Sequence, residues 1–104
     1  MANSREMKAA VVRKTKLACL AAYSDGAMRC ADCGYANVDA LVIDHVLHDG
    51  PEHRRRVGGG YAIYYDLKRR NFPPGFRVLC MNCNWLREVA RRTAEGRSRK
   101  KHET

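Results

Sequence analysis

The distribution of apolar residues predicts a long helix at the start of the chain. Within residues 3–23, Val12, Leu20 and Tyr23 share one flank with several alanines, the spacing of an amphipathic helix. Asp25-Gly26 follows as a turn that ends it. The other flank is rich in lysine and arginine, so we expect it to face solvent or a polyanion.

Two short strands and a second helix are predicted in the middle of the chain. The run Leu41-Val42-Ile43 favours a strand, and the turn-rich segment before it makes residues 30–45 a predicted local hairpin. Residues 49–60 have the composition of a loop. Residues 61–70 predict a short helix, which the following prolines end. FRVL, at 76–79, is the second predicted strand.

The last predicted element is a helix over WLREVARRTAE. It places Trp85, Leu86, Val89 and Ala90 on one side, and Gly96 is a natural stop. The eight residues that follow are polar and charged, a composition typical of a disordered tail.

Net charge adds a class of partner to this picture. The 104 residues suffice for one domain with a small core. Twenty lysines and arginines against eleven acids give a formal net charge of +9 and a pI near 9.7, which favours nucleic acid as a partner, with solubility as the alternative explanation. No signal peptide is visible, and no apolar run approaches the roughly 18 residues of a membrane span. We therefore expect a soluble cytoplasmic protein without a membrane partner.

Four of the five cysteines form two CxxC pairs, Cys30 with Cys33 and Cys80 with Cys83. In a reducing compartment, such pairs indicate metal binding rather than a disulfide. Together they complete a closed tetrahedral site for Zn²⁺, so we expect a structural ion on which folding depends. Redox chemistry at a CxxC pair is the alternative. Cys19 stands apart and is expected to be a small buried apolar residue.

Three further polar residues stand at two places in the sequence: at the end of the first predicted strand and directly after the last paired cysteine. Asp44-His45 ends the apolar run, and Asn84 follows Cys83 directly. A zinc site would bring these segments together. Asp44 and Asn84 offer oxygen ligands suited to Mg²⁺, and His45 offers a proton acceptor near neutral pH. The alternatives are a surface pair or turn for Asp44-His45 and a helix N-cap for Asn84.

The order of these motifs resembles that of a known family. CxxC at 30–33, DH at 44–45 and FRVLCMNCN at 76–84 are similar to the HNH, or ββα-metal (His-Me finger), endonucleases with a four-cysteine zinc site. Small phage-associated members and the recombination endonuclease VII type are most alike, over residues 28–90. The resemblance implies an α+β fold: a small ββα-metal core stapled by the zinc site, with an N-terminal helix and an inserted short helix.

Three parts of the chain follow from this resemblance. Residues 1–27 would form a basic helix packed on the core, residues 28–96 the HNH endonuclease domain, and residues 97–104 a basic disordered tail.

The resemblance also implies a reaction, the metal-dependent hydrolysis of DNA phosphodiester bonds. His45 would activate water, while Asp44 and Asn84 would hold a single Mg²⁺ or Mn²⁺ that stabilises the phosphate and the leaving 3′ oxygen. His48 and His53 are further candidate catalytic residues. The family commonly has a histidine where Asn84 stands and an asparagine before the second strand, so the group that orients His45 is unassigned.

Basic residues are the predicted DNA contacts. They follow the candidate catalytic segment, end the inserted helix and recur along the second strand and last helix, where they would bind phosphates without selecting bases. The set is Arg54, Arg55, Arg56, Lys68, Arg69, Arg70, Arg77, Arg87 and Arg91.

Two other functions fit the same features. A non-catalytic zinc module could bind DNA or RNA through these arginines, and a small interaction protein assisting phage DNA packaging would need only the zinc core. A phage-encoded protein would act in the bacterial host cytoplasm, with packaging or recombination proteins as partners. A homodimer is a further expectation, because cutting two strands from one site per chain requires two copies or sequential nicks.

Overall fold

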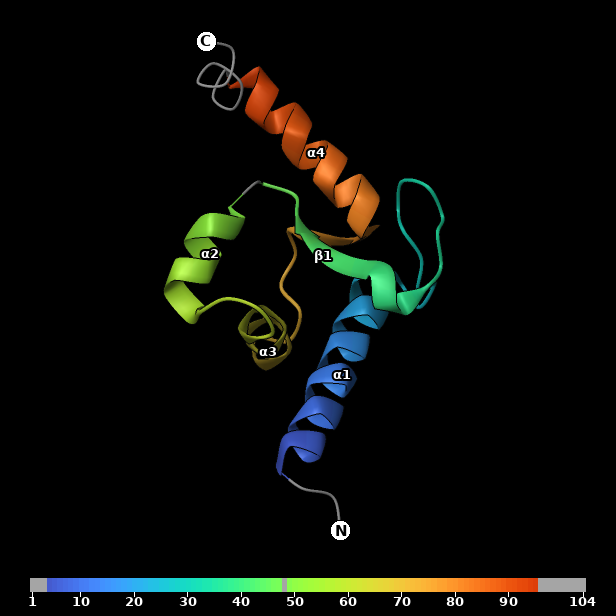
Figure 1. Cartoon of the computed structure of the whole chain (residues 1–104), viewed down its shortest axis with the longest axis vertical. Helices are drawn as coiled ribbons and strands as arrows, with labels where there is room; N and C mark the ends of the chain where they lie inside the picture. Colours follow the sequence, from blue (N-terminus) through green and yellow to red (C-terminus); the bar gives the residue numbers. More distant parts are fainter. Residues whose placement is uncertain (1–3, 48, 96–104) are drawn as a thin grey trace.

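The computed structural model describes residues 4–47 and 49–95, in which four α-helices surround a two-stranded sheet (Figure 1). The α+β class predicted from the sequence is confirmed. Gly96 and the predicted tail at 97–104 lie outside the described residues. In chain order the elements are α1 (Ser4–Tyr23), the 3-10 turn η1 (Val38–Ala40), β1 (Leu41–His45), α2 (Gly50–Val57), α3 (Ala62–Arg69), β2 (Phe76–Cys80) and α4 (Met81–Ala94).

The sheet consists of β1 and β2, which are antiparallel and far apart in sequence. Leu41 lies opposite Cys80, and His45 lies opposite Phe76. The local hairpin predicted over residues 30–45 is therefore wrong, because only the end of that segment is a strand and its partner is β2. The segment before β1 is fixed in another way: the Ala31 N–H donates to the Val78 carbonyl of β2 at 2.9 Å.

Helix α1 confirms the amphipathic helix predicted near the start of the chain. It packs against α3 and both strands, and it buries Cys19 and Leu20 completely. Cys19 is thus the buried residue that was expected. The helix closes where predicted: Asp25 and Gly26 have φ values of 56° and 81°, and the Gly26 N–H donates to the Ala21 carbonyl at 2.9 Å, as in a left-handed C-terminal cap.

Helix α2 occupies most of the segment that was predicted to be a loop. Pro51 stands in its first turn, where a missing N–H leaves no helical hydrogen bond unmade, and Glu52 puts a negative charge at the positive end of the helix dipole. Gly58, with φ of 97°, lies immediately after the helix. The prediction failed because the helix is mostly polar: its buried residues are Gly50 and His53, and Val57 packs partly buried against the core.

Helix α3 confirms the short helix predicted at residues 61–70, and a tight turn joins it to β2. Asn71 and Phe72 have φ values of 60° and 56°. The Phe72 N–H donates to the Leu67 carbonyl at 2.8 Å, which closes the end of the helix. Pro73 and Pro74 then lead into the strand, so β2 begins at Phe76, shortly after α3 ends at Arg69.

Helix α4 begins at Met81, earlier than predicted. Cys80 is its N-cap, and the Cys80 Sγ accepts a hydrogen bond from the Cys83 N–H at 3.4 Å. Asn84 therefore lies inside the helix, and the alternative that made it the N-cap is wrong. Trp85 and Leu86 are 54% and 56% exposed, so the apolar side predicted for this helix is not buried. The reason is that α4 points away from the sheet, toward the end of the molecule opposite α1 (Figure 1).

The core is small and includes metal-ligand candidates. Leu20, Leu41 and Leu67 are completely buried, and Cys30 and Cys80 are only 2% and 4% exposed. The sulfurs of these two cysteines thus belong to the same packed cluster as the leucines. None of the described helices has the length and hydropathy that crossing a membrane requires.

Candidate functional site

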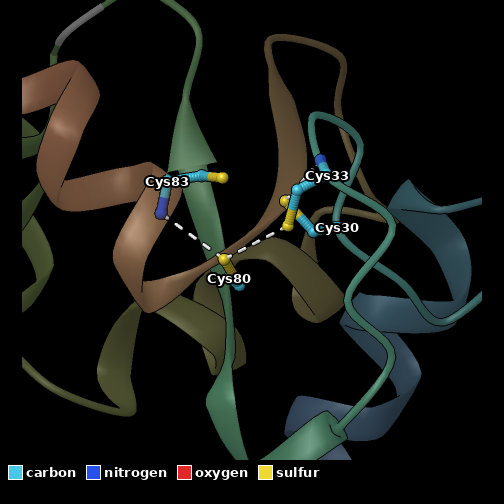
Figure 2. Close-up of side chains that lie close together, drawn as sticks. All are labelled: Cys30, Cys33, Cys80 and Cys83. Carbon is cyan, nitrogen blue, oxygen red and sulfur yellow. Dashed lines mark hydrogen bonds between the residues drawn. The ribbon is translucent and has the colours of Figure 1, made fainter.

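The four paired cysteines lie together, as predicted. All four sulfurs are within 4.8 Å of one another, and the Cys33 and Cys80 sulfurs are 3.7 Å apart. Tetrahedral zinc with Zn–S bonds of about 2.3 Å would separate its ligand sulfurs by roughly 3.8 Å. Figure 2 shows that Cys30 and Cys33 come from the loop after α1, while Cys80 and Cys83 come from the end of β2 and the first turn of α4. These cysteines are therefore positioned to hold a metal ion, and the cluster is compatible with structural zinc.

Backbone amides prepare each pair for negative charge. The Cys33 N–H donates to the Cys30 sulfur at 3.5 Å, as the Cys83 N–H does to Cys80. Burial opposes ionisation of Cys30, but backbone donors outweigh it and lower its pKa to about 6. The hydrogen bond to Cys80, followed by burial, raises the pKa of Cys83. Without a cation the thiols therefore compete for protons, and a bound metal would allow all four to ionise.

A cleft of about 560 Å³ lies between β1, α2 and α4. Asp44 and His45 reach it from the end of β1, Gly50 from the start of α2, and Asn84 from α4. Neighbouring strand residues normally face opposite sides, but β1 ends at His45, so both members of the pair border the cavity. The cleft thus brings together the three residues that the sequence singled out for metal binding and proton transfer.

His45 begins a buried chain of hydrogen bonds. His45 Nε2 and His53 Nδ1 are 2.8 Å apart, and His53 Nε2 and Asp66 Oδ2 are also 2.8 Å apart. Asp66 in turn accepts hydrogen bonds from Arg69 and Arg70 at 2.7 and 3.0 Å. His53 and Asp66 are 2% and 4% exposed. His53, predicted as a catalytic residue in a loop, is therefore a buried helix residue that links His45 to Asp66. His48 lies outside the described residues.

The surroundings of this hydrogen-bond chain shift the pKa values of His45 and Asp66. Burial lowers the pKa of His45, and the neighbouring His53 acts in the same direction, against a smaller opposing effect of Asp49. The imidazole of His45 is therefore neutral near pH 7. Burial also opposes ionisation of Asp66, but hydrogen bonds from His53 and Arg70 outweigh it and hold the pKa of Asp66 below 3.8. The chain thus ends on a carboxylate.

Asp44 is paired with two arginines. Its Oδ2 atom is 3.3 Å from Arg77 Nε and 3.5 Å from Arg87 Nε. Arg77 faces Asp44 across the sheet and also lies 3.7 Å from Asp32. Within the described part of the chain, Arg77 Nη2 and Arg87 Nε are buried donors without a hydrogen-bond partner. Positive charge therefore surrounds Asp44, with hydrogen-bonding capacity left over.

The predicted DNA contacts divide into three groups. Those lining the cleft are Arg54, Arg87 and Arg91. Outside the cleft lining, those whose guanidinium groups bind Asp44 or Asp66 are Arg69, Arg70 and Arg77, and Arg87 of the first group also binds Asp44. Those exposed on the surface outside the cleft lining are Arg55, Arg56 and Lys68. Arg91 is in addition ion-paired with Glu88 and Glu95, so the free cationic character of the cleft comes mainly from Arg54.

Asp66 and Gly50 were not predicted as site residues. A signal for Asp66 was present, because Ile63, Asp66 and Leu67 share the spacing of one helix face and all three are buried. A carboxylate on an apolar helix face must have partners. Gly50 gave no such signal, because its importance depends on His45 approaching it from another element.

Comparison of the chain with models of protein families, with curated proteins and with solved structures found no match.

Proposed function

We propose that the protein is an HNH-type, metal-dependent endonuclease that hydrolyses phosphodiester bonds in DNA. The observation that carries the proposal is that Asp44, His45 and Asn84, from two separate elements, border one cleft. Hydrolysis of a phosphodiester needs a base for water, a cation for the phosphate and positive groups that bind the backbone. The cleft contains side chains suited to each of these tasks.

His45 is the proposed general base. Its imidazole is neutral near pH 7 because burial lowers its pKa, so it can take a proton from water. The oxygen of that water forms a bond to phosphorus while the bond from phosphorus to the 3′ oxygen breaks. The leaving oxygen takes a proton from solvent, and the products are a 3′ hydroxyl and a 5′ phosphate.

Asp44 and Asn84 are the proposed ligands of a single Mg²⁺ or Mn²⁺. One carboxylate and one amide oxygen are hard ligands that leave positions for water and for a substrate phosphate. When bound, the ion would neutralise charge on the phosphate and on the leaving oxygen. Arg87 lies 3.5 Å from Asp44 Oδ2 with a side chain 33% exposed, so it can turn from the carboxylate toward a bound phosphate.

The cysteine cluster is proposed to hold structural Zn²⁺ that sets the position of Asn84. Cys83 precedes Asn84 in the first turns of α4, and Cys80 joins that helix to the end of β2. An ion tying both cysteines to the loop of Cys30 would fix the start of α4 against the sheet. Without it, Asn84 would lose its place on the cleft that Asp44 also lines.

Nicking of supercoiled plasmid tests the proposal. Zinc-loaded protein should convert the plasmid to relaxed circles only when Mg²⁺ or Mn²⁺ is added. His45→Ala should abolish nicking and Asn84→Ala should weaken it, while Asn82→Ala, an exposed asparagine of the same helix outside the cleft lining, should cleave at the wild-type rate. Wild-type protein that binds the plasmid but leaves it supercoiled with either ion would overturn the proposal.

The ion pairs of Asp44 favour a second candidate function. A carboxylate already neutralised by Arg77 and Arg87 is also what a structural site requires, and a non-catalytic zinc module would bind nucleic acid through the remaining cleft arginines. The plasmid assay separates the two, since this module would retard DNA on a gel without nicking it.

The homodimer, the packaging or recombination partners and the cytoplasmic location stay predictions.

A further inference from the structure

We propose that His53 and Asp66 are positioning residues that fix the orientation and tautomer of His45. The inference rests on the proposed role of His45 as general base and extends it to two residues on α2 and α3. These side chains are 2% and 4% exposed, so they act on a substrate only through His45.

The order of donors along the chain follows from its far end. Asp66 is a carboxylate bound by Arg69 and Arg70, so it accepts and His53 Nε2 carries the proton. In a neutral imidazole only one ring nitrogen is protonated, so the neutral form of His53 accepts the next bond at Nδ1. The proton between the two rings then belongs to His45 Nε2. His45 Nδ1 is left with a free electron pair.

Space beside His45 Nδ1 is kept open by a glycine. A Cβ atom at Gly50 would lie 3.4 Å from His45 Nδ1 and 3.3 Å from Arg54 Nη1. Both nitrogens therefore face the same spot at the start of α2, on the lining of the cleft. A water molecule or phosphate oxygen placed there would meet a proton acceptor and a cation together, which is the arrangement that an attacking water requires.

A purely structural role for His53 and Asp66 would not require their hydrogen-bond chain to reach the cleft. Asp66 already has two arginine partners, and α3 is anchored by Ile63 and Leu67, which are 7% and 0% exposed. The additional link through His53 connects this stable carboxylate to a ring on the cleft wall. Without the link, His45 could rotate and populate both tautomers, and a misplaced reacting group lowers rates on the order of 10²-fold.

The tautomer of His45 can be measured without any activity. Long-range ¹H–¹⁵N correlation spectra of zinc-loaded protein at about pH 8, where the imidazole is neutral, report which ring nitrogen carries the proton. Wild-type His45 should be protonated at Nε2. In His53→Leu this preference should be lost, and in His53→Asn, whose amide oxygen can replace Nδ1 as acceptor, it should be retained. Wild-type His45 protonated at Nδ1, or an unchanged His45 spectrum in His53→Leu, overturns the proposal.

Single-turnover nicking supplies the second measurement. His53→Leu and Asp66→Asn should slow cleavage on the order of 10²-fold at an unchanged Kd for DNA, with partial recovery in His53→Asn. Gly50→Ala should also slow it, while Gly59→Ala, whose added Cβ meets nothing within 4 Å, should not. Circular dichroism and zinc content identify any variant that fails to fold, and equal rates in wild type and folded His53→Leu would refute the positioning role. Absence of nicking by wild type would refute the proposed function alone, because the spectra still decide the tautomer.

Discussion

Removal of the proposed zinc ion is expected to unfold the protein. The perturbation is Cys83→Ser, which removes one of four sulfurs lying within 4.8 Å of one another. Its control is Cys19→Ala, which removes the fifth thiol, on the buried face of α1. The two variants compare loss of a ligand with loss of a buried thiol that has no metal to hold.

The magnitude follows from the size of the core. Among the residues that the structure describes, seven aliphatic side chains besides the cysteines are buried in the core, and burying each contributes about 1.5–3 kcal/mol. Net stabilities of domains are about 5–15 kcal/mol after conformational entropy is subtracted, whereas structural zinc contributes about 10–16 kcal/mol. The free energy lost with the ion therefore exceeds the net free energy of unfolding that so small a core can provide.

Metal content and circular dichroism provide the assay. Wild type and Cys19→Ala should contain one zinc ion per chain and unfold cooperatively, while Cys83→Ser should lack both the ion and the thermal transition. A stoichiometric strong chelator should unfold wild type as well. Wild-type protein that keeps its helical spectrum and its Tm after the metal has been removed would refute this reasoning.

Three further predictions concern separate parts of the molecule. Stability should fall as pH rises from about 9 to about 11, because burial raises the pKa of the Cys19 thiol from 9.0 to about 11 and only the unfolded chain ionises freely in that window; urea unfolding of Cys19→Ala should lack this component. Arg87→Ala should strengthen Mn²⁺ binding in calorimetry without DNA, since it removes a cation 3.5 Å from Asp44, whereas the exposed Arg55→Ala should not change it. Arg54→Ala should reduce the slope of log K for DNA against log salt by about one, and an unaltered slope would remove Arg54 from the DNA contacts.

Features encoded by neighbouring residues were predictable from the sequence. The spacing within each CxxC pair is visible in the sequence and predicts a pair of metal ligands. The β-branched and aliphatic run Leu41-Val42-Ile43 likewise predicts β1 from side-chain type alone. The same is true of Asp25-Gly26 at the end of α1. Each of these depends on interactions within a few residues, so local rules suffice.

Features that depend on distant contacts were not predictable in the same way. The partner of β1 is β2 rather than the preceding segment, because the cysteine loop is attached to β2 by Ala31. Helix α2 has the composition of a loop, and the hydrogen-bond partners of its buried His53 lie outside the helix, on β1 and α3. The orienting group for His45 could not be assigned for this reason: Asp66 acts through an intermediate ring.

Two parts of the fold hold the residues of the candidate site. Asn84 depends on the cysteine cluster, because Cys80 and Cys83 form the first turn of its helix. His45 depends on His53 and Asp66, which are held by the α2–α3 side of the fold. The two supports meet at the sheet: Asp44 and His45 are adjacent on β1, and β2 carries both Cys80 and Phe76, whose ring contacts His45 and His53. Substitutions that break the His45–His53–Asp66 hydrogen-bond chain should therefore leave metal binding at Asp44 intact while slowing proton transfer. Substitutions in the cysteine cluster should displace Asn84 and disrupt the core packing together.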